Sequence, residues 1–218
     1  MSDVTFAITS CGRPELLEKT IESFLKLNSY PIDRYLIIED KNENSVFVKT
    51  LITSRFPQFE LEITEKRIGQ IKAIEKIYKK IDTKYVFHCE DDWLFTKSGF
   101  IEKSIPILEK NKDVLQVHIR KYNKINGHPV SNGYLLEDIP VRKLNFNYLK
   151  VWHGFSWNPG LRRTEDILIN GKLLEYKYEH EFSIHYKNLG FYVVVLDDEE
   201  GYVEHIGWGQ HVKDPFGV

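Results

Sequence analysis

The stretch that decides the fold is an apolar run followed at once by three carboxylates, Tyr85-Val86-Phe87-His88-Cys89-Glu90-Asp91-Asp92-Trp93. A short apolar run that ends in a polar turn is typical of a strand buried inside a parallel sheet. Open α/β sheets bind their ligands at the carboxyl ends of such strands. The stretch therefore predicts a central strand over residues 85–89 with a polar site at its end.

The chain before this strand alternates between strand and helix patterns. Strands are predicted over residues 4–10, 35–38 and 61–64. Helices are predicted from Pro14 to about Asn28, from the loop 41–45 to Arg55, and over 68–81, where isoleucines recur at helical spacing. Because parallel neighbours need crossover connections, this order predicts an α/β fold with a mostly parallel central sheet and flanking helices, in three layers.

The chain after this strand is less regular. We expect a helix over about 99–110, a strand over 114–119, helices over 166–174 and 179–189, and a strand over 192–196. Between them lies a long aromatic and polar stretch that reaches Trp157, and the tail from Gly201 is rich in glycine, histidine and tryptophan. A length of 218 residues suits one domain, 1–218, with a binding half (1–112) and a closing half (113–218).

Composition excludes several classes of protein. A formal net charge of −2 gives no basic field of the kind that drives nucleic-acid binding. The longest late apolar run, 191–196, is too short to span a bilayer, so we expect a cytoplasmic protein with no transmembrane segment. Two cysteines, Cys11 and Cys89, exclude a disulfide scaffold and a multi-cysteine zinc site. Whether they meet, and the oligomeric state, stay open.

Acidic residues end two of the predicted strands, with Asp40 after the second and residues 90–92 after the fourth. Residues two apart in an extended segment point the same way, so we expect Glu90 and Asp92 to face one point while Asp91 faces away. Two carboxylates suit Mg²⁺ or Mn²⁺, which completes its shell with water and substrate phosphates. A solvated acidic turn that caps the next helix would show the same spacing.

The phosphates of a nucleotide need another holding device, because the first strand is followed by a single glycine, Gly12. The sequence has neither G-x-G-x-x-G nor G-x-x-x-x-G-K-[ST]. The cations best suited to phosphates are Arg67, Lys72, Arg162 and Arg163, of which at least half are expected to be ordinary solvated side chains.

Further candidate residues lie in the second half. His205 could fold back as a third metal ligand or as a donor to a leaving diphosphate, with a structural role as the alternative. Glu179 and Glu181 begin a predicted helix, as caps or as a base for an acceptor hydroxyl. Four tryptophans could offer flat faces to sugars, although at least two are expected in the core: Trp93, Trp152, Trp157 and Trp208.

Taken together, these segments resemble the family-two-like glycosyltransferases with the GT-A fold over nearly the whole chain. The first strand and the loop after it are similar to the family's nucleoside site, which implies that Thr9 and Cys11 face the base and that Asp40 contacts the uracil or ribose. Residues 65–70 resemble the N-x-G segment beside the donor, with Arg67 where asparagine is common and with Gly69. Residues 85–93 resemble the metal-binding D-x-D segment, in an E-D-D form.

The resemblance extends to the second half. It implies metal ligands at Asp92, Glu90 and His205, a donor contact at Asp91, and an acceptor loop over 154–160 that includes Trp157 and Asn158. Residues 179–182 resemble the E-D-x-x-[LF] helix of the catalytic base, which selects Glu179 and leaves Glu181 as the alternative. His205-Ile206-Gly207 resembles a C-terminal H-x-G that closes on the metal and diphosphate.

The activity that the resemblance implies is inverting sugar transfer by a hexosyl- or related glycosyltransferase. The donor is a nucleotide-diphosphate sugar, UDP-linked by expectation, and the acceptor is a glycan, lipid-linked or other hydroxyl, as in polysaccharide biosynthesis. Mn²⁺ or Mg²⁺ is the implied cofactor, residues 1–112 form the donor half, and 113–218 form the acceptor half. The alternatives are a sugar-phosphate nucleotidyltransferase, which would normally have a glycine-rich first loop, and a non-catalytic module that binds nucleotide sugar or glycan.

Overall fold

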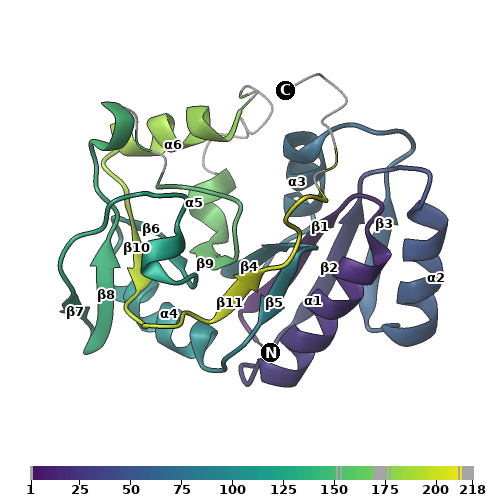
Figure 1. Cartoon of the computed structure of the whole chain (residues 1–218), viewed down its shortest axis with the longest axis horizontal. Coiled ribbons are helices and arrows are strands. Elements are labelled where there is room, and N and C mark those ends of the chain that lie inside the picture. The colour runs from purple at the N-terminus through teal and green to yellow at the C-terminus, as the bar shows by residue number, and fades with distance from the viewer. Residues whose placement is uncertain are drawn as a thin grey trace.

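The computed structural model describes residues 2–150, 152, 154–168, 176, 178–210 and 212. Its first half follows the predicted alternation of strand and helix (Figure 1). The elements are β1 (Val4–Ser10), α1 (Pro14–Leu27), β2 (Arg34–Glu39), α2 (Ser45–Arg55), β3 (Phe59–Ile63), α3 (Gln70–Tyr78) and β4 (Tyr85–Glu90). The order predicted for this half is confirmed, with ends that differ by a few residues.

The second half holds more strands than the sequence indicates. Its elements are β5 (Trp93–Phe95), α4 (Phe100–Lys110), β6 (Val114–His118), β7 (Tyr134–Leu136), β8 (Ile139–Lys143), β9 (Gly160–Arg163), α5 (Thr164–Leu168), α6 (Glu179–Asn188), β10 (Tyr192–Leu196) and β11 (Val203–His205), with short 3-10 turns at Tyr122–Lys124 and Tyr148–Lys150. The predicted helix over 166–174 starts two residues earlier, and its part beyond residue 168 lies outside the described residues.

The main sheet is mostly parallel, as predicted. In the described part of the chain it has nine strands in the order β3-β2-β1-β4-β9-β6-β10-β8-β7. Only β9 and β8 run against the others, since β9 is antiparallel to β4 and β6, and β8 is antiparallel to β10 and β7. The mixed half of the sheet is thus built around an inserted antiparallel strand, β9.

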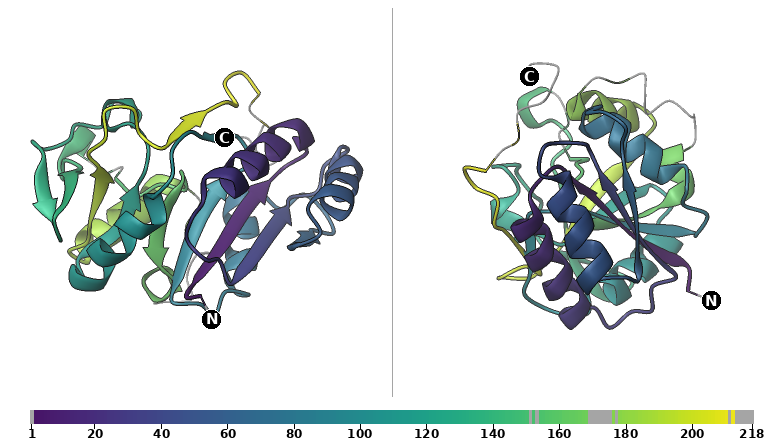
Figure 2. Two further views of the ribbon diagram at one scale, coloured as in Figure 1. Left: turned by 90° about the horizontal axis from the view of Figure 1, so that it is seen from below. Right: turned by 90° about the vertical axis from the view of Figure 1, so that its right-hand side faces the viewer.

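Helices cover both faces of this sheet, which gives the predicted three layers (Figure 2). On one face α1, α2 and α4 pack through a buried cluster, where the rings of Phe6 and Phe24 stack at a centroid distance of 3.7 Å. On the other face α3, α5 and α6 pack through Ile74, Ile167 and Phe182. Burial of these apolar faces supplies the main driving force for the fold.

The register of the parallel strands brings the acidic strand ends to one edge. Ser10 pairs with Glu39, and Thr9 pairs with Glu90. The tail folds back to this edge, because β11 pairs antiparallel with β5 and sets His205 opposite Trp93. The edge predicted to carry the site is therefore assembled from the ends of β1, β2, β4 and β11.

Two of the expected phosphate-binding cations are structural. Arg162 and Arg163 lie on β9 and are fully buried. Arg163 donates to Asp166 at 2.6 Å and to the main-chain carbonyl of Val114 at 2.6 Å, so it joins β9 to α5 and β6. The expectation that they reach phosphates or solvent is wrong, because β9 lies inside a sheet whose two faces are both covered by packed side chains and helices.

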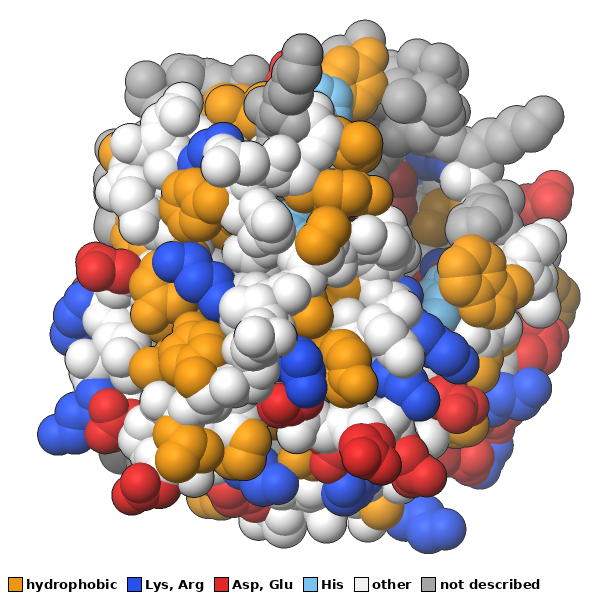
Figure 3. Space-filling view, turned by 60° about the vertical axis from the view of Figure 1, so that its left-hand side comes forward, with side chains coloured by type: hydrophobic (Ala, Val, Ile, Leu, Met, Phe, Trp, Pro, Cys, Tyr) orange, Lys and Arg blue, Asp and Glu red, His pale blue; other side chains and the backbone are white. Residues whose placement is uncertain are grey.

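The surface carries charges of both signs, in keeping with the small net charge (Figure 3). None of the helices in the described part of the chain has the length and apolar character needed to cross a bilayer.

Candidate active site

A pocket of about 600 Å³ opens at the carboxyl edge of the sheet. It is lined by twelve of the residues singled out in the sequence: Thr9, Cys11, Asp40, Arg67, Gly69, Glu90, Asp91, Asp92, Trp93, Asn158, His205 and Trp208. These residues come from both halves of the chain, and the parallel strand ends together with the returning tail bring them to one place.

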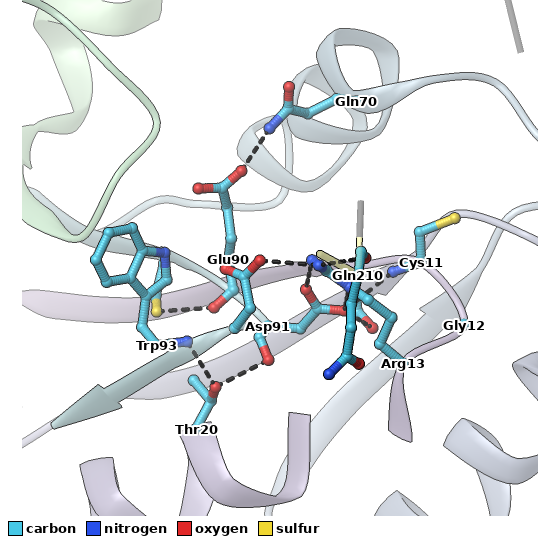
Figure 4. Close-up of polar contacts among 12 residues, drawn as sticks. Cys11, Gly12, Arg13, Thr20, Gln70, Glu90, Asp91, Trp93 and Gln210 are labelled. Carbon is cyan, nitrogen blue, oxygen red and sulfur yellow. Dashed lines mark hydrogen bonds and ion pairs between the residues drawn. The ribbon is translucent and has the colours of Figure 1, made fainter. Parts of the chain in front are cut away.

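Asp91 is the most firmly held carboxylate of the pocket, and it is fully buried. It accepts hydrogen bonds from the Ser10 hydroxyl at 3.0 Å and the Cys11 amide at 3.3 Å, and it forms an ion pair with Arg13 (Figure 4). Burial raises its pKa, and the Arg13 guanidinium acts in the opposite direction. These contacts join the loop after β4 to the loop after β1.

The prediction that the Asp91 side chain faces away from that of Asp92 is wrong. Arg13 donates to Asp91 and, through Nη1, to the Oδ2 of Asp92 at 2.8 Å, so the two neighbouring carboxylates converge on one guanidinium. Alternation of side chains requires extended backbone, and the strand ends at Glu90, where a turn begins. Glu90 instead accepts a hydrogen bond from Gln70 at 2.7 Å, on the side away from Arg13 (Figure 4).

Asp92 and His205 form the core of the site. Asp92 is 5% exposed, and its Oδ2 lies 3.2 Å from the Nε2 of His205. Its Oδ1 is buried and has no hydrogen-bond partner within the described part of the chain. The C-terminal tail packs directly against Asp92. The Ile206 amide donates to the main-chain carbonyl of Asp92 at 2.9 Å, and a Cβ at Gly207 would overlap the Asp92 side chain.

These residues fit a divalent cation that shares its shell with a substrate. Asp92 offers a buried oxygen without a partner among the described residues, and His205 offers a nitrogen beside it. Across the described ranges no group of three or more His, Cys, Asp and Glu residues could hold a metal ion, and Glu90 is not brought to the other two. Mg²⁺ and Mn²⁺ commonly take one or two protein ligands and complete their shell with water and phosphates.

The end of the pocket that the sequence analysis expects to bind the donor is organised by Glu39 and Asp40. Asp40 accepts hydrogen bonds from the amides of Ile68 and Gly69, both at 2.8 Å, and so fixes the loop before α3. Glu39 is fully buried, accepts from the Gly12 amide at 2.7 Å, and has a pKa that burial raises. Gly12 has a φ of 65°, in the left-handed region that favours glycine. The single glycine after β1 thus serves this tight turn.

Trp157, which was expected to contact the acceptor, does not line the pocket. Its ring is fully buried against Tyr78, His88 and Phe182, so it offers no face to a sugar. Trp93 and Trp152 are also core residues, and Trp208 is the tryptophan that stays exposed. Aromatic side chains bury large apolar areas, and sequence alone does not separate such a core ring from a binding face.

The two candidate bases occupy different positions at the start of α6. Glu179 accepts a hydrogen bond from the Trp157 amide at 3.1 Å, beside Asn158 of the pocket wall. Glu181 accepts from the Tyr178 amide at 2.9 Å and caps its own helix. The Glu179 residue is exposed overall, but its carboxyl end reaches in to the 156–158 loop. Loss of solvent there raises the pKa of Glu179, while the Trp157 amide and the Arg162 cation lower that pKa.

The sequence reasoning missed several pocket residues, among them Arg13, Arg120 and Asn126. Arg13 follows β1 directly, so its position at the carboxyl end of a predicted strand was an available signal. Arg120 lies two residues beyond β6 and is 7% exposed, with its guanidinium 5.0 Å from the Trp93 ring. Its place in the pocket depends on β9 inserting between β4 and β6, which no local pattern indicates.

The thiol of Cys11 gives a first test of this pocket. Burial raises the pKa of Cys11 to about 11 from an ordinary 9.0, although the thiol is partly exposed and lines the pocket. Because the thiolate is the nucleophile, we expect iodoacetamide to alkylate Cys11 roughly a hundredfold more slowly at pH 7.5 than an unperturbed thiol. Mass spectrometry of the labelled peptide measures the rate. Labelling at the rate of a free thiol would contradict the geometry.

Comparison with known proteins agrees with this architecture. A family model described as "Glycosyl transferase family 2" matches residues 5–167. No curated protein sequence matches the chain.

Several solved structures share the fold. The mannosyltransferase PcManGT from Pyrobaculum calidifontis, solved with GDP-Man and Mn²⁺, is 13% identical with a TM-score of 0.62, and the match covers 91% of this chain and 56% of that one. GalNAc-T7 with UDP, GalNAc and Mn²⁺ is 12% identical with a TM-score of 0.65 over 92% of this chain and 43% of that one. S. aureus TarS is 13% identical with a TM-score of 0.62, over 91% and 36%. The chain thus spans between about a third and just over half of the length of these structures.

Proposed function

Because the chain belongs to glycosyl transferase family 2, we propose that it transfers a sugar from a nucleotide-diphosphate sugar to a hydroxyl acceptor, with inversion at the anomeric carbon. The observation that carries the proposal is the pocket in which Asp92 and His205 lie 3.2 Å apart, beside the donor-side residues Asp40, Arg67 and Gly69. Two relatives of the same fold were solved with Mn²⁺ and a nucleotide, which supports a similar ligand here.

Asp92 and His205 would hold Mn²⁺ or Mg²⁺ in this proposal. When bound, the cation supplies electrostatic stabilisation of the negative charge on the departing diphosphate. The protein adds its own positive charge, because Arg13, Arg67 and Arg120 all line the pocket. Arg13 also holds Asp91 and Asp92 in place through ion pairs, so the ligand carboxylate is positioned before any substrate arrives.

The donor half supplies the nucleoside site. The loops after β1 and β2 carry Thr9, Cys11 and Asp40, and we propose that they hold the base and ribose of a UDP-linked sugar. We propose that residues 113–218 form the acceptor half, in which Asn158 and Asn126 contact the acceptor. Their amide groups can both donate to and accept from sugar hydroxyls.

Glu179 is the proposed base that takes the proton from the acceptor hydroxyl. Its carboxylate is held by the amide of Trp157, the residue before Asn158 of the pocket wall, whereas Glu181 is occupied as a helix cap. The leaving group is a diphosphate and needs no protein acid, so a single carboxylate suffices for this mechanism.

The pH dependence of the reaction follows from the environment of Glu179. The base acts only when ionised, and its pKa is raised above the ordinary 4.5, so we expect activity to fall on the acid side through a pKa above 4.5. Arg162 lowers that pKa, so Arg162→Gln should move the acid limb to higher pH, while Arg162→Lys should move it less. Rate profiles between pH 4 and 9 test this, and an acid limb that neither variant moves would contradict it.

The experiment that tests the function is product analysis with a panel of nucleotide sugars and Mn²⁺. We expect release of a nucleoside diphosphate, accelerated by an acceptor. Release of pyrophosphate from a nucleoside triphosphate and a sugar phosphate would instead support a nucleotidyltransferase. Binding without any turnover would support a non-catalytic module.

A further inference from the structure

Trp208 is the one tryptophan of the four that the structure leaves exposed, with 69% of its surface accessible, against 2% or less for the other three. It lines the pocket together with His205 and Asp92. Single exposed apolar side chains are common on protein surfaces, but this ring borders a pocket lined mainly by charged and amide side chains. The placement points to a ligand that covers the ring.

The indole is held in place on both sides along the chain. Before it, the His205 ring meets Trp208 edge to face at a centroid distance of 4.6 Å and also contacts Trp93 at 4.9 Å. The guanidinium of Arg120 lies over the Trp93 ring, 5.0 Å from its centroid. After it, the carbonyl of Gln210 accepts a hydrogen bond from Arg13 at 3.3 Å.

These contacts determine at which end of the pocket Trp208 lies. His205 pairs with Trp93, the residue that directly follows Asp92. The contacting rings of Trp93, His205 and Trp208 therefore lie at the β4 end of the site. Asp40 follows β2, which is separated from β4 by β1, and adjacent strands lie about 4.8 Å apart. Asp40 therefore lies roughly 10 Å away along the sheet edge, two strands from β4, whereas Thr9 and Cys11 at the end of β1 lie one strand away.

The chemistry of the surroundings selects the ligand. Beside the indole, Asn126, Asn158 and Arg120 offer hydrogen-bond donors and acceptors. A pyranose presents hydroxyls at its rim and an apolar C–H face, so it matches a polar wall and an exposed aromatic ring together. We propose that Trp208 is the sugar platform of this pocket and stacks on the C–H face of a pyranose. This inference rests on the proposed function and specifies how the sugar is held.

The sugar could belong to the donor or to the acceptor, and calorimetry on the full chain distinguishes them. One arm titrates UDP, GDP and their glucose, N-acetylglucosamine and mannose conjugates in Mn²⁺, and a second titrates cellobiose, maltose and chitobiose in Mn²⁺ and UDP. The variants are Trp208→Ala and Trp208→Phe, which keeps an aromatic face. Phe47→Ala is the matched control, since Phe47 is 60% exposed on α2 and does not line the pocket.

We expect Trp208→Ala to leave nucleotide affinity within about twofold and to weaken sugar-dependent binding about fivefold to tenfold, with partial recovery in Trp208→Phe. Loss confined to the nucleotide sugars assigns the platform to the donor, and loss confined to the free sugars assigns it to the acceptor. Equal sugar affinity in Trp208→Ala and wild type would overturn the inference, as would wild-type binding that gains nothing from any sugar. Failure of the proposed function has a separate signature, because wild type would then bind no nucleotide in either arm.

Discussion

Asp92→Asn is expected to lower the rate of sugar transfer by about a thousandfold and to remove most of the Mn²⁺ affinity. The substitution keeps the shape of the side chain and removes the negative charge that faces His205 and Arg13. It also replaces one buried oxygen of the carboxylate, which has no partner among the described residues, with a poorer metal ligand. Electron paramagnetic resonance of free Mn²⁺ measures the affinity independently of turnover.

The matched control is Asp82→Asn. The Asp82 side chain is 83% exposed and does not line the pocket, so this variant changes the net charge by the same amount without touching the site. We expect its Mn²⁺ binding and its rate to match wild type. Unchanged Mn²⁺ affinity in Asp92→Asn would mean that the cluster with Arg13 and His205 is only a structural ion-pair network.

Glu179→Gln is expected to reduce kcat by a factor of about a hundred to ten thousand, with little change in donor affinity. The amide keeps the hydrogen-bond acceptor for the Trp157 amide but cannot take a proton from the acceptor hydroxyl. Steady-state kinetics with saturating donor measure the loss in kcat, and calorimetry with the nucleotide checks that the donor site is intact.

Glu181→Gln provides the comparison within the same helix turn. Its carboxylate accepts the Tyr178 amide as part of a capping box, and glutamine can fill the same role. We expect unchanged kcat and a change in the free energy of unfolding within about 1 kcal/mol. If Glu181→Gln loses the activity and Glu179→Gln keeps it, the assignment of the base is reversed.

The regular half of the fold was predictable because its patterns are local. Alternation of buried strands with amphipathic helices determined the order from β1 to β4, and the carboxylates at the ends of β2 and β4 indicated where the pocket forms. The residues alone suggested that the tail could fold back with His205 over the site, and the family resemblance assigned its H-x-G to the metal and diphosphate. The structure adds a local reason, since β11 has a partner in β5 directly after Asp92.

The remaining features depend on contacts between distant segments. Strands of three or four residues such as β5, β9 and β11 are too short to give a periodic signal. The Arg13–Asp91 pair joins residues 78 positions apart, and its geometry follows from the turn after Glu90 rather than from strand alternation. Trp157 and Trp208 look alike in sequence, and only tertiary packing separates the buried ring from the exposed one.

The most direct test of the central claim is isothermal titration of the wild-type chain with UDP, GDP and dTDP, each with and without Mn²⁺. We expect one nucleotide to bind more tightly by at least about tenfold when Mn²⁺ is present, because Asp92 and His205 would share the cation with its diphosphate. If none of the three binds under either condition, the pocket is not a nucleotide-sugar site.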